Sequence, residues 1–294
     1  MSNVREAPGR VVSTVGQGLE ECWMDFAGAR MRYLRAGSGR PLILLHGLMA
    51  YSFSWRYAMP ALAPYASVYA PDMLGAGFSD RARVDHSMRA TARRVLRFAD
   101  NLGLNSFDLL GTSRGGAVAM CAAEECISQG RPRLRKLVLV APVNPYSAHG
   151  KQLAAFAGTP VGAAVVRAVL EKIPSLYPFW HARMFADRSK IPAGSLDGYK
   201  APLAIPGLFD HALSIVKTWG ADLQELEALL PRLREVPTLL VWGEKDPAVY
   251  ASSMDPLARN FADVRTVLFK NVGHLPYEEC AEEFNRELIQ FLTK

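Results

Sequence analysis

Short apolar runs alternate with longer stretches of mixed polarity along most of the chain. Where apolar residues run together or alternate, we predict strands at residues 23–26, 31–35, 42–45, 67–70, 107–110, 134–140, 236–242 and 266–269. Where they recur with a helical period, we predict helices at residues 55–63, 87–102, 115–128 and 284–292. The residues before Glu21 are expected to form a tail. This alternation predicts an α/β fold, with a mostly parallel central sheet flanked by helices.

The alternation breaks after the sixth predicted strand, between residues 143 and 230. This stretch has helical segments such as residues 162–172, interrupted by Pro160, Pro174, Pro178, Pro192, Pro202 and Pro206. Because the strand pattern resumes at Val236, we expect a helical insertion within one α/β domain. The predicted organisation is a first core part at residues 1–142, the insertion at 143–230, and a second core part at 231–294.

The composition agrees with one globular domain in the cytoplasm. Half of the 294 residues (50%) are hydrophobic, which allows a substantial buried core. The first residues lack the apolar segment of a signal peptide, and no apolar run reaches the ~18 residues of a membrane span. We therefore expect no stable membrane insertion.

The net charge of +6 does not point to nucleic acid. Arg89, Arg93 and Arg97 recur every four residues and so share one helix face, while the opposite face is apolar. This is the pattern of a helix that packs on a sheet and keeps its charges in water. Since no nucleic-acid-binding motif accompanies it, we expect no nucleic-acid partner.

The cysteines indicate neither a metal site nor a disulfide framework. Their spacing fits no metal-ligand pattern, and they are expected to be free thiols: Cys22, Cys121, Cys126 and Cys280. We expect no metal and no cofactor.

A Gly-x-Ser-x-Gly pentapeptide supplies a candidate nucleophile. Residues 111–115 contain Gly111, Ser113 and Gly115, and they lie between a predicted strand and a predicted helix. A serine on such a sharp turn has strained dihedral angles and close backbone neighbours, which explains the two glycines. The following helix directs its N-terminus at negative charge that develops on a reacting oxygen.

An acid and a base follow this serine in the order that a catalytic triad on this type of sheet requires. Asp246 comes just after the strand at 236–242, and His274 comes after the strand at 266–269. Glu244 is a competing acid, and we favour Asp246. Residues 46–49 follow the strand at 42–45, where the amide of Leu48 could contribute to an oxyanion hole.

These pieces together resemble the α/β-hydrolase fold family over nearly the whole chain, from residue 23 to residue 292. The resemblance implies a helical cap after the sixth strand, formed by the insertion. In a further family-like stretch, Asp72, Gly75 and Gly77 are expected to shape a loop beside the site. Separately, His46 is expected to form hydrogen bonds with backbone groups. Haloalkane dehalogenases and epoxide hydrolases of this fold carry aspartate where this chain has Ser113, and this departure speaks against both chemistries.

The residue types then imply acyl transfer. His274 takes the proton of Ser113, whose oxygen attacks a carbonyl carbon, and Asp246 holds the imidazole. The amides of Leu48 and Arg114 are expected to bind the oxyanion. We predict a carboxylic ester hydrolase. The alternatives are a carbon-carbon bond hydrolase of a diketone-like acid, a cofactor-independent perhydrolase or haloperoxidase, and a ligand receptor without turnover.

The aromatic content of the insertion favours a small-molecule substrate with an apolar acyl or aryl portion. Met49, Trp180 and Phe209 are candidates for its contacts. The side chain of Arg114 is a further candidate, since dehalogenases of small carboxylated substrates are similar in placing arginine after the nucleophile, where it grips a carboxylate. Alternatively, this side chain turns away from the pocket and leaves only its amide in the chemistry.

Overall fold

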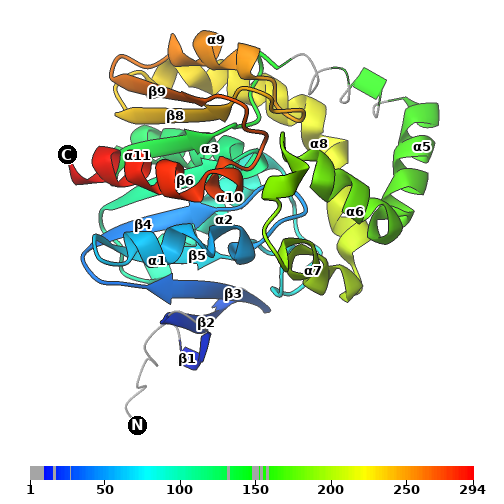
Figure 1. Ribbon diagram of the computed structural model, residues 1–294, viewed down its shortest axis with the longest axis horizontal. Helices are drawn as coiled ribbons and strands as arrows, with labels where there is room; N and C mark the ends of the chain where they lie inside the picture. Colours follow the sequence, from blue (N-terminus) through cyan, green and yellow to red (C-terminus); the bar gives the residue numbers. More distant parts are fainter. Residues whose placement is uncertain are drawn as a thin grey trace.

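A nine-stranded sheet runs through the protein, whose computed structural model describes residues 10–15, 18–26, 28–130, 133–147, 152, 155–156 and 159–294. The strands are β1 (Arg10–Val15), β2 (Leu19–Phe26), β3 (Ala29–Ala36), β4 (Arg40–Leu45), β5 (Ala66–Pro71), β6 (Phe107–Thr112), β7 (Leu134–Val140), β8 (Thr238–Gly243) and β9 (Val264–Phe269). They lie in the order β1-β2-β3-β5-β4-β6-β7-β8-β9 (Figure 1). Pairing is antiparallel from β1 to β5 and parallel from β5 to β9, which confirms the predicted architecture.

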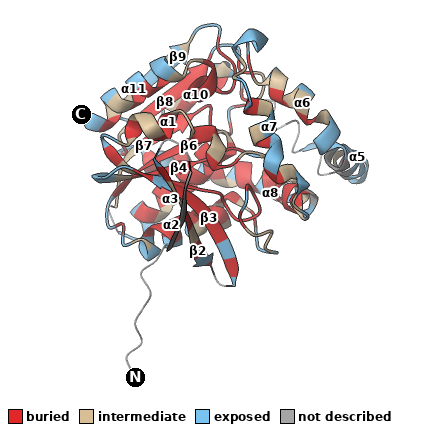
Figure 2. Cartoon of the chain, turned by 60° about the horizontal axis from the view of Figure 1, so that its bottom comes forward, coloured by how far each residue is buried: buried red, intermediate tan, exposed pale blue. Residues whose placement is uncertain are grey.

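Successive residues of the parallel strands pack on opposite faces of the sheet. In β4, Ile43 and Leu45 join one core cluster, whereas Leu42 and Leu44 join the other. The first cluster includes residues of α2 (Met88–Asn101), α3 (Arg114–Ser128) and α9 (Met254–Ala258), and the second includes residues of α1 (Ala58–Leu62) and α11 (Ala281–Thr293). Both faces are thus covered, and the central strands β6 and β8 are wholly buried, whereas the edge strand β9 is only partly buried (Figure 2).

Four helices of the predicted insertion gather on one side of the molecule (Figure 1). They are α5 (Pro160–Glu171), α6 (Ile173–Arg183), α7 (Ser195–Lys200) and α8 (Leu208–Leu229). Pro160 begins α5, and Pro174 lies in the first turn of α6, where a missing amide costs nothing. We call this helical group the cap. It follows β7, and the bounds 143–230 remain a prediction.

A further helix, α10 (Pro276–Glu279), and short 3₁₀ turns lie in the connections. The turns are at Ser52–Trp55, Arg188–Lys190, Ala201–Ala204, Leu230–Leu233 and Ala251–Ser253. The helix predicted at residues 55–63 is therefore a 3₁₀ turn followed by the short α1. No helix in the described part of the chain is long and apolar enough to cross a membrane.

The tail predicted before Glu21 was wrong. Residues 10–15 form β1, which pairs antiparallel with β2, and β2 itself begins at Leu19. The segment Arg10–Val15 is rich in β-branched residues, a composition that favours a strand when a partner strand lies alongside. That partner is the neighbouring β2, so the two strands extend the antiparallel edge of the sheet.

The arginine face of α2 is only partly solvated. Arg93 and Arg97 are exposed as expected, but Arg89 is partly buried and contacts Glu124 (2.5 Å) and Glu225 (2.6 Å). Ser87 caps the N-terminus of the helix, because its hydroxyl accepts a bond from the amide of Ala90. Arg89 thus ties α2 to α3 and α8.

The four cysteines are free thiols, as predicted.

Candidate active site

Ser113 occupies a strained turn between β6 and α3. Its φ of 52° and ψ of −123° lie outside the ordinary regions for a residue with a side chain. Backbone bonds hold the turn, because the Ser113 amide donates to the carbonyl of Val140 (2.9 Å) and its carbonyl accepts from the amides of Val143 (2.9 Å) and Gly116 (3.0 Å). The serine therefore stands at the carboxyl end of a central strand and at the N-terminus of a helix.

The two glycines of the pentapeptide are required by close backbone contacts. A Cβ at Gly111 would lie 2.3 Å from the carbonyl oxygen of Gly115. A Cβ at Gly115 would lie 2.4 Å from the carbonyl oxygens of Leu45 and His46. Real Cβ atoms do not approach backbone this closely, so any side chain at either position would displace the turn. The sequence motif is thus explained by the packing of β6, α3 and the loop after β4.

The imidazole of His274 is held by Asp246. Nδ1 of His274 lies 2.7 Å from Oδ2 of Asp246, and both side chains are buried. The other carboxylate oxygen of Asp246 accepts from the amides of Ala248 (2.7 Å) and Val249 (2.9 Å). These bonds orient the carboxylate, and the carboxylate orients the ring, as in a serine-histidine-aspartate arrangement.

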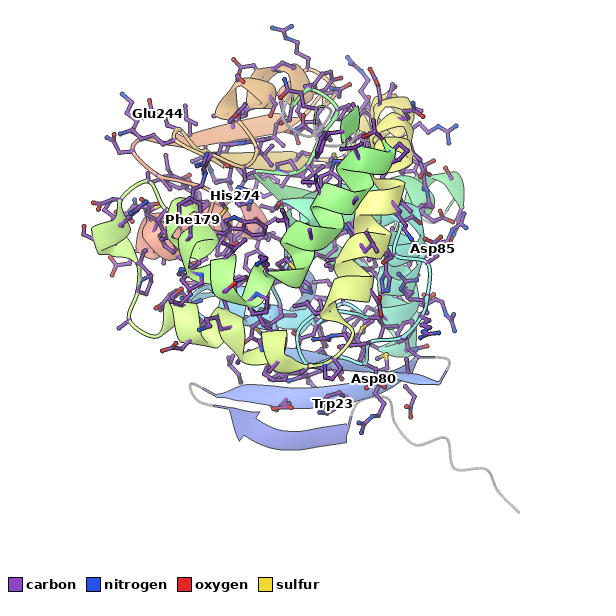
Figure 3. All side chains as sticks on the ribbon, turned by 90° about the vertical axis from the view of Figure 1, so that its right-hand side faces the viewer. Trp23, Asp80, Asp85, Phe179, Glu244 and His274 are labelled. Atoms are coloured by element: carbon purple, nitrogen blue, oxygen red, sulfur yellow. The ribbon has the colours of Figure 1, made fainter. Side chains whose placement is uncertain are left out.

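Glu244 does not reach this histidine. Its side chain is exposed, and its carboxylate accepts from the amide of Asn271 (3.1 Å). Figure 3 shows Glu244 at the periphery of the molecule, whereas His274 lies inside, beneath the cap helices. The acid nearest His274 is therefore Asp246.

The loop after β4 lies beside Ser113. A Cβ at Gly47 would lie 3.2 Å from Cβ of Ser113, so this loop and the turn are in close contact. His46 is buried and bonds the carbonyl of Gly47 through Nδ1 (2.8 Å) and the amide of Met73 through Nε2 (3.0 Å). Burial lowers its pKa. His46 thus has the expected backbone role, and Leu48 and Met49 follow at the edge of the cavity described below.

Asp72 has the structural role expected of it. Its carboxylate accepts from the amides of Ser52 (2.8 Å) and Phe78 (2.9 Å) and from the guanidinium of Arg32 (3.2 Å). A Cβ at Gly77, where φ is +53°, would lie 2.4 Å from this carboxylate. The aspartate and the glycine therefore fix the loop after β5.

Ser113 and His274 open into a cavity of about 310 Å³ between the core and the cap. Leu48 and Met49 line it from the loop after β4, and Trp180 lines it from α6. Further residues that border it are Ala50, Val143, Tyr177, Met184, Trp219, Val249 and Tyr277. The wall is mainly apolar and aromatic, which is the usual character of a small-molecule site.

The cap aromatics differ in where they lie. Trp180 and Trp219 border the cavity, whereas Phe185 belongs to the core and Phe156 and Phe179 are exposed. Phe209 lies in α8, but its side chain falls outside the described residues. Only some of the aromatic residues of the cap therefore line the cavity.

The side chain of Arg114 turns away from the main cavity. It is buried beside α2, where it donates to the carbonyl of His86 and lies 3.4 Å from the hydroxyl of Thr91. Burial lowers its pKa to about 10, and the nearby carboxylate of Asp222 opposes this change. Arg114 borders a separate small cavity and is not among the residues that line the cavity at Ser113. Its side chain is thus not placed to contact a substrate there.

A buried carboxylate joins the cap to the core. Glu278 of α10 accepts two bonds from Arg56 (2.9 and 2.7 Å) in the core. On the cap side, Ser195 donates to it (2.9 Å), and the hydroxyl of Tyr199 also donates to it. Ser195 in turn contacts Nε2 of His181 (2.9 Å), which lies in the cavity wall. We call this group the Glu278 cluster.

Glu278→Gln is expected to lower the free energy of unfolding by about 3 kcal/mol, because it leaves the guanidinium of Arg56 partly buried without a countercharge. Denaturant unfolding monitored by circular dichroism measures this change. Glu282→Gln, an exposed residue of α11, is the matched control and should change the stability by less than about 0.5 kcal/mol. Equal effects of the two substitutions would contradict a structural role for the cluster.

A second carboxylate joins the loop of His274 to the segment after α6. Glu279 accepts from the amides of Gly273 (2.8 Å), Ala186 (3.1 Å) and Asp187 (2.9 Å). The amide of His274 donates to the carbonyl of Met184 (2.7 Å). The backbone that carries the histidine is thus bonded directly to the segment that follows α6.

Sequence reasoning missed several of these residues. Tyr199 and Tyr277 line the cavity, and Glu278 and Glu279 organise its surroundings, yet none was singled out. Two adjacent glutamates soon after His274 could have been a signal, since buried carboxylates need partners. Apart from Gly273, their partners lie far away in the sequence, so the signal alone would not have identified the contacts.

The fold agrees with comparisons to known proteins. Residues 40–281 match the family model of the alpha/beta hydrolase fold. Haloalkane dehalogenase 2 of Mycobacterium tuberculosis is 30% identical over 286 residues, which cover 92% of this chain and 94% of the relative.

Two solved structures show the same fold. One is a meta-cleavage product hydrolase from Pseudomonas fluorescens, with a TM-score of 0.73, 24% identity, and coverage of 91% of this chain and 95% of its own. The other is a thermophilic esterase from Thermogutta terrifontis, with a TM-score of 0.73, 22% identity, and coverage of 98% of both chains. The chain is a hydrolase that belongs to the alpha/beta hydrolase fold family.

Proposed function

We propose that this protein hydrolyses carboxylic esters with an apolar acyl or aryl portion, through an acyl-enzyme on Ser113. The observation that carries the proposal is the convergence of three side chains. Ser113 stands on a strained turn, Asp246 holds Nδ1 of His274, and both Ser113 and His274 line one apolar cavity. This is the arrangement that activates a hydroxyl toward a carbonyl carbon.

In the proposed reaction, Nε2 of His274 takes the proton of Ser113 as its oxygen attacks the ester carbonyl. The carboxylate of Asp246 keeps the ring in the tautomer with the proton on Nδ1 and stabilises the imidazolium. His274 then gives the proton to the leaving alcohol. A water molecule, activated by the same imidazole, attacks the acyl-enzyme, releases the acid and restores the hydroxyl of Ser113.

The oxyanion is proposed to bind the backbone amides of Leu48 and Arg114. Arg114 is the first residue of α3, so its amide is free of the intrahelical bonds that occupy later amides. Leu48 belongs to the loop that contacts Ser113 and lines the cavity. Each donor of such a hole typically contributes on the order of 3 kcal/mol to the transition state.

The identity of the nucleophile argues against the activities of some relatives. A carboxylate that displaces a halide, or opens an epoxide, forms an ester that water can cleave. A serine that did so would form an ether, which has no carbonyl for water to attack. Although one relative is named a haloalkane dehalogenase, Ser113 therefore favours acyl chemistry in this chain.

The cavity also favours esters over a diketone-like acid. Its described lining residues include no lysine or arginine, and the guanidinium of Arg114 lies elsewhere. A carboxylate buried there would lack a countercharge, which is costly. A carbon-carbon bond hydrolase acting on an acid would need such a partner.

A panel of p-nitrophenyl esters of increasing acyl length tests the proposal. We expect turnover with a burst of p-nitrophenol, and no dienone consumption in a parallel assay for carbon-carbon cleavage. Wild-type protein that hydrolyses none of the esters, or hydrolyses them equally well without Ser113, would contradict the proposed function.

Arg114→Met is expected to affect neutral and ω-carboxylated esters equally. The reason is that the side chain bonds the carbonyl of His86 and does not line the cavity. The ratio of kcat/KM for the two esters should change by less than about threefold. A selective loss for the carboxylated ester of about 30-fold, which corresponds to ~2 kcal/mol for one charged hydrogen bond, would instead show that the arginine binds substrate.

A further inference from the structure

Met49, in the loop that is proposed to bind the oxyanion, has a left-handed backbone. Its φ is 59°, a value that is uncommon for a residue with a long side chain and that carries strain. A strained residue keeps such a conformation only where its surroundings hold it, and strained residues gather at functional sites. The contacts that hold Met49 therefore bear directly on the proposed chemistry.

A tight turn around Met49, which we call the oxyanion turn (residues 47–50), fixes the peptide plane between Gly47 and Leu48. The amide of Ala50 donates to the carbonyl of Gly47 (3.4 Å), and Nδ1 of His46 donates to the same carbonyl (2.8 Å). Nδ1 carries the proton, because Nε2 of this ring accepts from a backbone amide. Since a peptide unit is planar, the two bonds to the Gly47 carbonyl also set the direction of the Leu48 amide.

The cap holds the oxyanion turn through a tyrosine hydroxyl. Tyr177 of α6 donates to the carbonyl of Met49 (3.2 Å), across a separation of 128 residues. The side chain of Tyr177 is buried, and burial raises the pKa of its hydroxyl, which therefore stays protonated and able to donate. Met49 and Ala50 also pack against the cluster formed by Tyr177 and Tyr199. The strained residue is thus held from the cap by a hydrogen bond and by packing against aromatic rings.

The same helix also supports the loop that carries the base. Met184 is the C-cap residue of α6 and follows Tyr177 by about two helical turns. Its carbonyl accepts from the amide of His274 (2.7 Å). The helix and its C-cap residue therefore bond both the oxyanion turn and the loop of His274, so a displacement of α6 would disturb both.

We propose that Tyr177 is a positioning residue for the oxyanion hole, whose hydroxyl holds the oxyanion turn in the form in which the Leu48 amide faces the oxyanion. When this bond is lost, Met49 can relax to an ordinary φ. The bond from Ala50 to Gly47 then opens, and the Leu48 amide is no longer fixed. The inference rests on the proposed ester hydrolysis and adds that the oxyanion hole is complete only while the cap is seated on the core.

Tyr177→Phe tests this role, because it removes the hydroxyl and keeps the ring in the cavity wall. We expect kcat on the best p-nitrophenyl ester to fall about fivefold, as for one hydrogen bond that acts only on the transition state. KM should change by less than about 1.5-fold, since the contacts of the bound ester are kept. A rise in KM with kcat unchanged would show instead that the hydroxyl binds substrate, and would overturn the proposal.

Tyr51→Phe is the matched control. The hydroxyl of Tyr51 also bonds the core to the cap, at the carbonyl of Gly198 (2.8 Å), but Tyr51 lies outside the oxyanion turn and is not among the described residues that line the cavity. Its loss should change kcat by less than about 1.5-fold, and the melting temperature verifies that both variants are folded. If the two substitutions lower kcat equally, the bond from Tyr177 only attaches the cap, and its positioning role is disproved while ester hydrolysis stands.

A double-variant cycle with Met49→Gly tests whether the hydroxyl acts through the strained residue. Glycine adopts a positive φ without strain, so the turn then depends less on the bond from the cap. Tyr177→Phe should therefore lower kcat less than about twofold in a Met49→Gly background, against about fivefold in the wild type. Both proteins of the second pair lack the Met49 side chain, so its contact with substrate cancels. Equal losses in the two backgrounds would contradict the proposal.

Hydrogen exchange separates the positioning role from the activity. The amide of Ala50, which bonds the carbonyl of Gly47, should exchange about fivefold faster in Tyr177→Phe than in the wild type. The amide of Ser54, which donates to the carbonyl of Tyr51 (3.0 Å), serves as the reference and should not change. If the wild type hydrolyses no ester, the proposed function fails, yet the exchange rate of Ala50 still decides whether Tyr177 holds the turn. Unchanged exchange of Ala50 in Tyr177→Phe would overturn the inference.

Discussion

Replacing Ser113 with alanine is expected to lower turnover by a factor of about 10⁴ to 10⁶, and His274→Ala should cause a loss of similar size. In the proposed mechanism the nucleophile and the base act as a unit, so either change would remove the covalent step. Both residues lie at the same cavity, and His274 is already oriented by Asp246 (2.7 Å). Initial rates on the best ester of the panel, with the amplitude of the p-nitrophenol burst, measure the effect.

The double variant Ser113→Ala/His274→Ala tests whether the two residues act together or contribute independently to turnover. If the residues act together, the double variant should be about as slow as either single variant. Circular dichroism and the melting temperature establish that each variant is folded. Activity that survives in folded Ser113→Ala would exclude the covalent mechanism.

Asp246→Asn is expected to lower turnover by roughly 10⁴. The amide can keep the contacts to the amides of Ala248 and Val249 through its oxygen. Its nitrogen, however, then faces Nδ1 of His274 and favours the tautomer that cannot accept the serine proton. The loss should appear in kcat with little change in the melting temperature.

Glu244→Gln is the control for the acid. This carboxylate is exposed and accepts from the amide of Asn271, far from the cavity wall, so its loss should change kcat by less than about twofold. If Glu244→Gln is the damaging substitution and Asp246→Asn is mild, the acid has been assigned to the wrong residue.

The turn at Ser113 could be predicted from sequence because its motif is contiguous. The pentapeptide with Gly111 and Gly115 lies between two periodic segments, and this context was enough, although the contacts that require Gly115 come from the loop after β4. The order of Ser113, Asp246 and His274 follows in the same way from the ends of predicted strands. These positions depend on strand boundaries, which hydrophobic patterning reveals well.

The surroundings of the site could not be predicted, because they depend on contacts between distant segments. The direction of the Arg114 side chain is set by the carbonyl of His86 and the hydroxyl of Thr91, which α2 brings alongside. Glu278 meets Arg56 across a separation of 222 residues. Nothing near either residue in the sequence specifies its partner.

The antiparallel edge of the sheet shows a different limit of prediction from sequence. The strand β1 was expected to be part of a tail, although its β-branched residues favour a strand. Its strand structure depends on pairing with β2. Isolated hairpin strands are marginal in water, so only the rest of the sheet makes this pairing favourable.

The bonds from Glu279 and His274 to residues 184–187 set a boundary for exchanging parts between enzymes of this family. In a chimera that receives a foreign cap across its whole length, the graft would set the position of the carbonyl that accepts from the amide of His274. The backbone of His274 would then shift together with the graft. A recombination junction that retains residues 184–187 of the host would preserve this support. The helices of the cap on either side of this stretch could then be exchanged with less effect on His274.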